Sequence, residues 1–474
     1  MTNVATSIRN RVFEAVRRAF KEFLGLPIAM VVCFVVFAGA TYIVDEIAWS
    51  NQNSIASLKW LARLLGDAKA IGNLLGIVAS SIITVTSITF SLLLIAVQQG
   101  ASALTSQVFD QFLRRRSNQL YFGYFVGLCV YVLLTLATVS DVHRPIFGAL
   151  VAIILTSAAL CIVVVLIYNT IDQMRPAEIV KEIHHYILRA RQTQKSLLEQ
   201  TRRKTSGSLT SRSRICSSES GFLSKIDIGA IRTALLDDEK TSHERLEIEM
   251  LAGIGAYIAY GDPLIDIHSM GPPAHDRYKA IRDTAVRAIT FDDGRDLNSD
   301  PSFGIEQLAI IGWTSVSTAK SNPMPGILVC QSLRDILARW AADGTVPEDA
   351  KSPVVYTDRV TQEAIEALES LAVVASESMQ HQTLAEIMRT LSILLLTLPH
   401  DRVRRVEETI LRSLSALGEH VLTHPLEASL QDVQQALRHI DRGESAEKVA
   451  QAVSQFRKSY GRLNSRATRV PQNG

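Results

Sequence analysis

Six small or polar side chains recur at helical spacing inside a long apolar run. Between Lys69 and Asp110 the chain carries no formal charge. Residues 71–97 alone are long enough to cross a hydrocarbon core of about 30 Å as a helix. Side chains three, four or seven residues apart share one narrow helix face. Hydroxyl and amide groups on that face could bond water or a polar solute along a path. The polar stripe consists of Gly76, Ser80, Thr84, Ser87, Ser91 and Gln98.

The polar stripe has two interpretations that the sequence leaves open. In the first, the small residues let a neighbouring helix approach closely, and the hydroxyls bond backbone carbonyls one turn earlier or on the neighbour. In the second, the stripe lines a water-filled path or a pore on the axis of an oligomer. The run holds no acidic or basic side chain. A proton relay or a voltage sensor would need one, so neither is predicted.

Three consecutive arginines, Arg114, Arg115 and Arg116, follow the uncharged run. Arginines directly after an apolar span stop its transfer and bind phospholipid headgroups at the membrane surface. A ring of them around the mouth of an oligomeric pore would favour anions. We interpret them first as a membrane-surface basic cluster.

The sequence holds no motif that would define catalysis, a cofactor or a metal site. The five cysteines lack metal or redox spacing, and there is no His-Glu-x-x-His, phosphate-binding glycine loop or nucleophile elbow. His184 and His185 are expected at a surface, and His268 and His275 flank a Gly-Pro-Pro turn. We assign no catalytic residue, no cofactor and no metal. A net charge of +2 gives no reason to expect a nucleic-acid partner.

The polar stripe belongs to the second of four uncharged runs, which predict four transmembrane helices. Lysine and arginine are concentrated before the first run, between the second and third, and after the fourth. The positive-inside rule therefore places both termini in the cytoplasm, and the family resemblance described below implies a bacterial inner membrane. The lipid bilayer is thus the expected partner. The predicted spans are residues 28–44, 71–97, 120–140 and 145–171.

The remaining chain is predicted to be a cytoplasmic α+β region that ends in a helical bundle. A helix over residues 177–200 leaves the membrane, and residues 201–219 are rich in serine and arginine, which is typical of a solvated linker. Residues 246–250 alternate apolar and charged side chains, as a half-buried strand does. The predicted parts are a basic amphipathic tail (1–27), the transmembrane domain (28–171), the exit helix and linker (172–219), the α+β domain (220–345) and the helical region (346–474).

The chain resembles a bacterial family of predicted multi-pass membrane proteins known only as a domain of unknown function. The resemblance extends from about Ile71 to beyond Leu333, and the common order of several segments carries it. It implies four membrane helices and a mixed cytoplasmic part, and no established activity. The segments are Ser80–Ser91 with Gln98, Phe109–Arg114 with Asn118-Gln119, Ser220–Asp227, Gly255–Leu264, and Asp300–Ile305 with Gln307-Leu308.

One segment departs from the family pattern. Where an acidic residue is expected before a proline, this chain has Asn322 before Pro323, in a loop that begins at Ser317. With Asp300, these residues form a candidate cytoplasmic loop. Two functions remain open. One is a homo-oligomeric channel or transport-like pore lined by the second helix. The other is a membrane-anchored sensing or interaction module whose cytoplasmic part binds a protein or a small ligand.

Overall fold

The computed structural model divides the chain into two compact units, residues 1–178 and 179–474. We call them the N-terminal unit and the C-terminal unit and describe each by itself. The predicted amphipathic tail lies almost wholly outside the described residues. The structure describes residues 24–50, 67–103, 115–140, 143–173, 175–206, 209, 211–242, 245–271, 275–317, 322–343 and 352–459.

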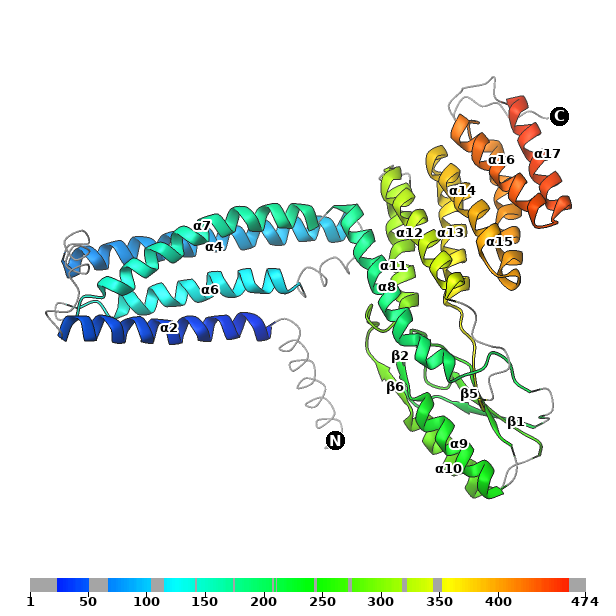
Figure 1. The fold of residues 1–474 in the computed structure, drawn as a ribbon, viewed down its shortest axis with the longest axis horizontal. Helices are drawn as coiled ribbons and strands as arrows, with labels where there is room; N and C mark the ends of the chain where they lie inside the picture. The colour runs from blue at the N-terminus through cyan, green and yellow to red at the C-terminus, as the bar shows by residue number, and fades with distance from the viewer. Residues whose placement is uncertain are drawn as a thin grey trace. The chain divides into compact units, whose positions relative to one another are not determined.

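Four long apolar helices form the N-terminal unit, as the hydropathy pattern predicts (Figure 1). Each is long and apolar enough to cross a membrane, and a helix satisfies all its backbone polar groups internally, as lipid requires. The helices run several residues past the predicted spans at most ends. They are α2 (Gly25–Ser50), α4 (Ala68–Ala103), α6 (Arg116–Ala137) and α7 (Ile146–Gln173).

Helices α2 and α6 approach closely because α6 carries two glycines one turn apart. A Cβ atom at Gly123 would lie 2.8 Å from Met30 Cβ and 3.0 Å from Pro27 Cα, and one at Gly127 would lie 2.3 Å from the Phe34 ring. Small residues spaced by four are a known contact pattern of membrane helices. The close approach that one interpretation assigned to α4 is therefore found, within this unit, on α6.

A buried carboxylate links the end of α2 to the start of α7. Asp45 accepts hydrogen bonds from the backbone N–H groups of Phe147, at 2.8 Å, and Gly148, at 2.9 Å. The Tyr131 hydroxyl donates to the Gly148 carbonyl at 3.2 Å. A carboxylate at a helix N-terminus accepts hydrogen bonds from free N–H groups, and its negative charge interacts favourably with the positive end of the helix dipole. These contacts explain an acidic residue at the end of an apolar helix.

The C-terminal unit begins within α8, the exit helix that the sequence predicts, and continues with two small sheets. The first sheet has the strand order β1-β5-β3-β7, antiparallel except for the parallel β3–β7 pair. The second has the order β4-β2-β6. Helices α9 (Ile228–Ser242) and α10 (His275–Arg287) share a hydrophobic core with both sheets. The elements are α8 (Pro176–Glu199), β1 (Ser211–Cys216), β2 (Gly221–Ile226), β3 (Glu247–Met250), β4 (Tyr257–Ile258), β5 (Pro263–Ser269), β6 (Ile289–Asp292) and β7 (Val354–Tyr356).

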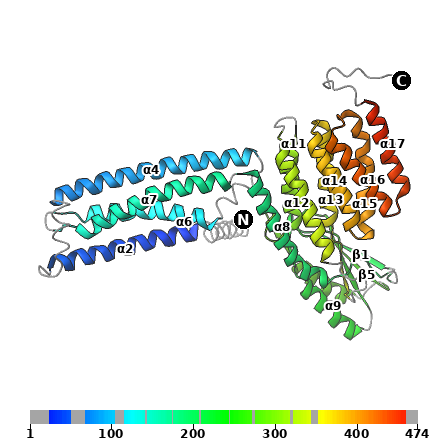
Figure 2. The same ribbon diagram turned by 45° about the horizontal axis from the view of Figure 1, so that its top comes forward.

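The rest of the C-terminal unit is helical, and its helices lie side by side in order along the chain (Figure 2). Helices α13, α14 and α15 each pack on neighbours one and two places away in sequence, as stacked helix pairs do. Pro399 and Pro425 stand at helix starts, where a missing N–H is tolerated. The helices are α11 (Pro301–Val316), α12 (Pro323–Ala342), α13 (Val360–Glu377), α14 (His381–Thr397), α15 (His400–Ser413), α16 (His424–His439) and α17 (Gly443–Ser459), with a 3₁₀ turn at Leu414–Glu419.

The structure corrects two sequence-based expectations in this unit. Part of the predicted linker, Ser211–Cys216, is the edge strand β1, paired along its length with β5. A serine- and arginine-rich strand has no apolar alternation to reveal it, and its pairing partner lies about fifty residues later in the sequence. Strand β7 was not predicted, because a three-residue run is too short to show a period.

Candidate functional site

The polar stripe lies on the outer face of α4. Ser80, Thr84, Ser87 and Ser91 are all exposed in the N-terminal unit, as is Gln98. No atom lies within 4 Å of the position that a Cβ would take at Gly76. The opposite face of α4 contacts α6 and α7. That buried face carries Ile71, Leu75, Ala79, Ile82, Thr86, Thr89 and Leu93.

Three of the four stripe hydroxyls bond to the backbone of their own helix. Ser80 Oγ donates to the Ile77 carbonyl at 3.0 Å, Thr84 Oγ1 to the Ser80 carbonyl at 2.8 Å, and Ser91 Oγ to the Ser87 carbonyl at 2.9 Å. Each hydroxyl oxygen still has free acceptor lone pairs. The stripe therefore needs no partner inside the unit and remains able to bond water or a second chain.

The outer faces of the other long helices differ in polarity from that of α4. Among the side chains that the structure describes, α4 exposes five serines and threonines, the four of the stripe and Ser81. On the same count α7 exposes only Ser157, α6 only Ser117 in its first turn, and α2 none. Lipid-facing surfaces are apolar, so the outer face of α4 is the atypical one. Exposed apolar side chains on α2 and α7 include Val32, Val36, Ile43, Ile154, Val164 and Ile171.

The basic cluster is partly described by the structure. Arg116 is exposed at the start of α6, and Arg115 is its half-buried N-cap residue, without a side-chain capping bond. Arg114 lies outside the described residues. Two arginines at the first turn of an apolar helix fit a membrane-surface position.

Asp300 does not join the other two residues of the candidate loop. The Asn322 N–H donates to the Ser315 carbonyl at 2.9 Å, which places Asn322 beside Ser317, at the end of α11 opposite Asp300. Asp300 caps the start of α11, where its carboxylate accepts from the Phe303 N–H at 3.1 Å, and Ser317 follows the other end of that helix. Sixteen residues of helix span about 24 Å. Asn322 caps α12 by accepting from the Met324 N–H at 3.3 Å. Asparagine and aspartate are equally good caps, so the departure from the family pattern preserves this role.

Two of the family segments do meet, at a cavity of about 690 Å³ in the C-terminal unit. Gly255 has a φ of +89°, and a Cβ there would lie 2.2 Å from Asp300 Oδ2. Asp300 in turn accepts from Arg295 Nε at 2.7 Å. Only glycine combines that backbone conformation with so close an approach. The cavity is lined by residues of the Gly255 loop, Arg295, Ser302, Glu306, Tyr356 and Glu363.

A titratable carboxyl faces this cavity from α13. Burial raises the pKa of Glu363 above its ordinary value, against the opposing effects of a hydrogen bond from Ser302 and the charge of Arg295. Nearby Asp300 and Asp358 raise the pKa further. Such a group can exchange a proton or pair with a cationic ligand at a pH nearer neutrality than an exposed glutamate.

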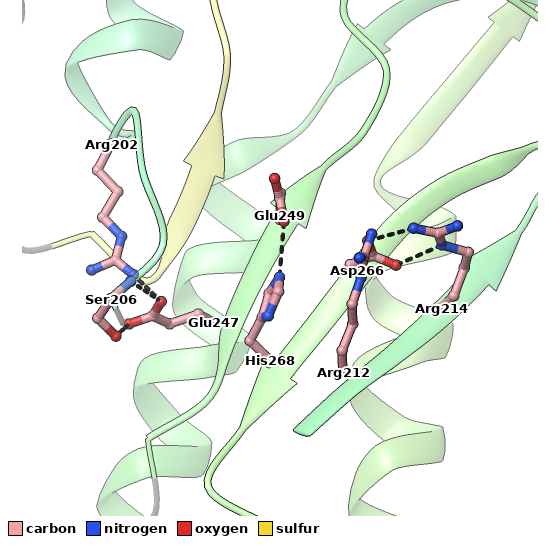
Figure 3. Close-up of polar contacts among 8 residues, drawn as sticks. All are labelled: Arg202, Ser206, Arg212, Arg214, Glu247, Glu249, Asp266 and His268. Atoms are coloured by element: carbon pink, nitrogen blue, oxygen red, sulfur yellow. Dashed lines mark hydrogen bonds and ion pairs between the residues drawn. The ribbon is translucent and has the colours of Figure 1, made fainter. Parts of the chain in front are cut away.

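One face of the first sheet carries charged residues on three adjacent strands (Figure 3). In the register, Arg214, Asp266 and Glu249 form one row, and Arg212, His268 and Glu247 form the next. The prediction of a half-buried β3 was wrong here, because Glu247 is 0% exposed. Its carboxylate contacts Arg202 and accepts from Ser206 N at 3.0 Å and Ser206 Oγ at 2.6 Å. The alternating pattern predicts correctly which side chains share a face of β3. It does not predict that a loop from another part of the chain covers that face.

Asp266 at the centre of the sheet is likewise buried. Burial acts to raise its pKa, yet hydrogen bonds and charge from Arg214 and Arg212 outweigh burial and hold the pKa below its ordinary value. His268 Nε2 lies 2.9 Å from Glu249 Oε2. Every carboxylate of this face has a cationic or imidazole neighbour, so the arrangement is a paired structural network. Among the described residues, no three His, Cys, Asp or Glu side chains lie together as a metal site would require.

His184 connects α8 to α12. Its Nδ1 lies 2.8 Å from Ser332 Oγ, and its Nε2 lies 3.1 Å from Asp335 Oδ2. The order Ser-His-Asp is that of a hydrolase triad, but Ser332 lies in the middle of α12. Backbone N–H groups there are used by the helix, which leaves none for an oxyanion hole. We interpret the contact as structural, and the predicted surface position of His184 as wrong, since its side chain is largely buried.

We expect the C-terminal unit to lose stability as the pH falls below neutrality. Burial lowers the pKa of His184 below its ordinary 6.5, against the opposing charge of Asp335 and with the support of His185 and Arg339. The unfolded chain therefore takes up a proton near pH 6.5 that the folded chain refuses, and stability is lost as pH falls from there through the native pKa. Thermal unfolding from pH 7.5 to 5 would measure this slope.

The matched variants for this measurement are H184Q and H185Q. H184Q removes the titrating group and should flatten the slope, whereas H185Q removes only a smaller contribution than burial to the lowered pKa of His184 and should leave most of the slope in place. An H184Q protein with the wild-type pH dependence would show that another group causes it.

The long apolar helices and the appended α+β and helical parts define the class of this protein. It is an α-helical membrane protein with four candidate spans. A family model described as "Predicted membrane protein (DUF2254)" matches residues 21–391, and the chain belongs to that family. The match begins earlier than the resemblance seen in the sequence and extends into α14. No curated protein and no solved structure matches the chain.

Proposed function

We propose that the protein is a homo-oligomeric channel or transport-like pore in which the outer face of α4 lines the path. The observation that carries the proposal is the exposure of the five polar side chains of the stripe on a helix whose other face is buried. Six small or polar residues in register would be unusual on a purely lipid-facing surface. Copies of the chain placed around an axis would turn these faces toward one another and toward water.

The proposal includes a location and an orientation. We place the chain in a bacterial inner membrane, and by the positive-inside rule both termini and the C-terminal unit lie in the cytoplasm. Arg115 and Arg116 would then stand at the cytoplasmic surface, where they bind anionic headgroups. The stripe offers neutral hydroxyls and no charge, so a path lined by it would select by size and hydration more than by charge.

Flux through proteoliposomes tests the proposal. Purified full-length protein should pass K⁺ or Cl⁻, and the variant with Ser80, Thr84, Ser87 and Ser91 all changed to leucine should lose at least about 90% of that flux. The variant should fold, because these four side chains are exposed on the part of the N-terminal unit that the structure describes. S157L, at the exposed hydroxyl on α7, is the matched control and should retain flux.

Two results would overturn the proposal. The first is a monomer by mass measurement in detergent and in nanodiscs, since one α4 cannot enclose a path. The second is a wild-type protein without flux of either ion, or a leucine variant with unchanged flux.

A second function, ligand sensing by the C-terminal unit, is favoured by the cavity at Gly255. The segments that carry the family resemblance on either side of it pack together through Gly255, Asp300 and Arg295. A cavity of about 690 Å³ is in the range that binds small ligands. Arg359 also lines this cavity. Saturable binding of a small ligand that is lost in E363Q and R359Q would support sensing. Binding unaffected by both variants would count against it.

A further inference from the structure

A second cavity in the C-terminal unit, of about 730 Å³, has a different chemistry. It lies where the C-terminal half of α8, the end of α12 and the segments around Arg202 and Tyr356 meet. Five cationic side chains and three carboxylates line it. The cationic ones are Arg191, Lys195, Arg202, Arg203 and Arg339.

Two of the cations are fixed by buried carboxylates and form a rigid wall. Arg191 donates to both oxygens of Asp358, at 3.0 and 2.6 Å, and its guanidinium lies 5.0 Å from the centroid of the Trp340 ring. Arg202 contacts the buried carboxylate of Glu247. These pairs are preorganised, so a ligand would meet cationic groups that are already held in place.

Two of the remaining three cations are available to a ligand, whereas Arg339 donates to Asp335 Oδ2 at 2.7 Å. Lys195 is exposed and makes no ion pair with any residue that the structure describes. Arg203 reaches Asp401 only at 3.7 Å. Part of this positive charge complements the carbonyl ends of α8 and α12. Neutralisation of these helix ends does not explain why the cationic side chains enclose a cavity.

An unsatisfied donor beside the cavity indicates a ligand. Trp340 is 8% exposed, and its buried indole N–H has no hydrogen-bond partner among the described residues. Arg202, with its side chain 9% exposed, likewise has an Nε without such a partner. Buried donors are nearly always paired, because an unpaired one costs about 1–3 kcal/mol. Both residues line this cavity, and the dipole of α12 does not account for either donor.

We propose that this cavity binds an organic anion that carries phosphate groups. Donors from several elements surround a space larger than an inorganic ion needs, and guanidinium groups match phosphate oxygens in geometry and charge. The phosphate could belong to a free metabolite or to the headgroup of an anionic phospholipid. This inference does not depend on whether α4 lines a path.

Binding to full-length protein tests the inference. ATP and pyrophosphate are the soluble probes, with adenosine as the neutral control, and phosphatidylglycerol nanodiscs compared with phosphatidylcholine nanodiscs form the lipid arm. Saturable binding in either arm, measured by calorimetry or thermal shift, supports the inference and identifies the source of the phosphate. Absence of binding in both arms overturns the inference. Citrate is an organic anion without phosphate, so citrate binding as tightly as ATP would overturn it as well.

The variants separate a ligand site from a structural role. K195Q/R203Q should weaken binding at least about tenfold, whereas K448Q, an exposed lysine on α17, should not. W340F removes the indole N–H and keeps a ring. It should weaken binding about fivefold without lowering the stability of the empty protein, since the donor has no partner to lose among the residues that the structure describes. Binding unchanged in both site variants would overturn the proposal.

Discussion

Replacing Glu247 with leucine should lower the unfolding temperature of the C-terminal unit by about 5–15 °C. Glu247 has no exposed surface and neutralises Arg202, which is itself buried. Removal of one partner leaves the other charge buried without compensation, and such losses are about 3–5 kcal/mol. Ser206 would lose acceptors for both its N–H and its hydroxyl. Differential scanning fluorimetry of the full-length protein in detergent would measure the shift.

Two further variants show whether burial of charge causes the effect. E249L changes the same residue type two positions along the same strand face, where the carboxylate is 31% exposed. Partly exposed pairs contribute about 1 kcal/mol or less, so this shift should be small. R202M/E247L removes both charges and should restore most of the stability. An E247L shift no larger than that of E249L would contradict the buried network.

The second large effect is expected in the N-terminal unit, from G123V on α6. The new side chain would meet Met30 Cβ at 2.8 Å and the Pro27 backbone at 3.0 Å. Backbone cannot move aside as a side-chain tip can, so α2 and α6 would have to separate. Overpacking of this kind costs about 1–3 kcal/mol, which corresponds to a loss of about 2–12 °C in unfolding temperature. Thermal loss of the monodisperse peak in size-exclusion chromatography would measure it.

The control for this prediction is G39V on α2, a glycine-to-valine change in a helix of the same unit. No atom lies within 4 Å of a Cβ at Gly39, so the added methyl groups meet open space. The unfolding temperature should change little. Equal losses in G123V and G39V would mean that helix propensity, and not the α2–α6 contact, explains the result.

The glycine pair also shows where sequence reasoning was incomplete. Gly123 and Gly127 form a G-x-x-x-G pattern that is readable in the sequence. The packing interpretation nevertheless assigned the close helix contact to the serine-rich run of α4. Both patterns satisfy the same small-residue rule. Spacing alone does not say which of two small-residue faces another helix covers.

The unsatisfied donor of Trp340 and the burial of Glu247 had no signal in the sequence. Trp340 closes a cavity with Arg202 and Arg203, which lie more than 130 positions away, in a segment that reads as a solvated linker. Glu247 alternates with apolar neighbours as a solvent-facing residue would. A loop from elsewhere in the chain covers it, and no local pattern encodes such an encounter.

By itself, the sequence determined the four apolar helices, the exit helix and the phase of the polar stripe. Each of these follows from local composition and period, because a helix in lipid must satisfy its own backbone and must present similar residues on one side. Only the tertiary structure decided which face of α4 stays outside, that β1 pairs with β5, and which charges are buried. Those outcomes depend on contacts between residues distant in the chain, and a periodic pattern names the residues that share a face without naming what covers it.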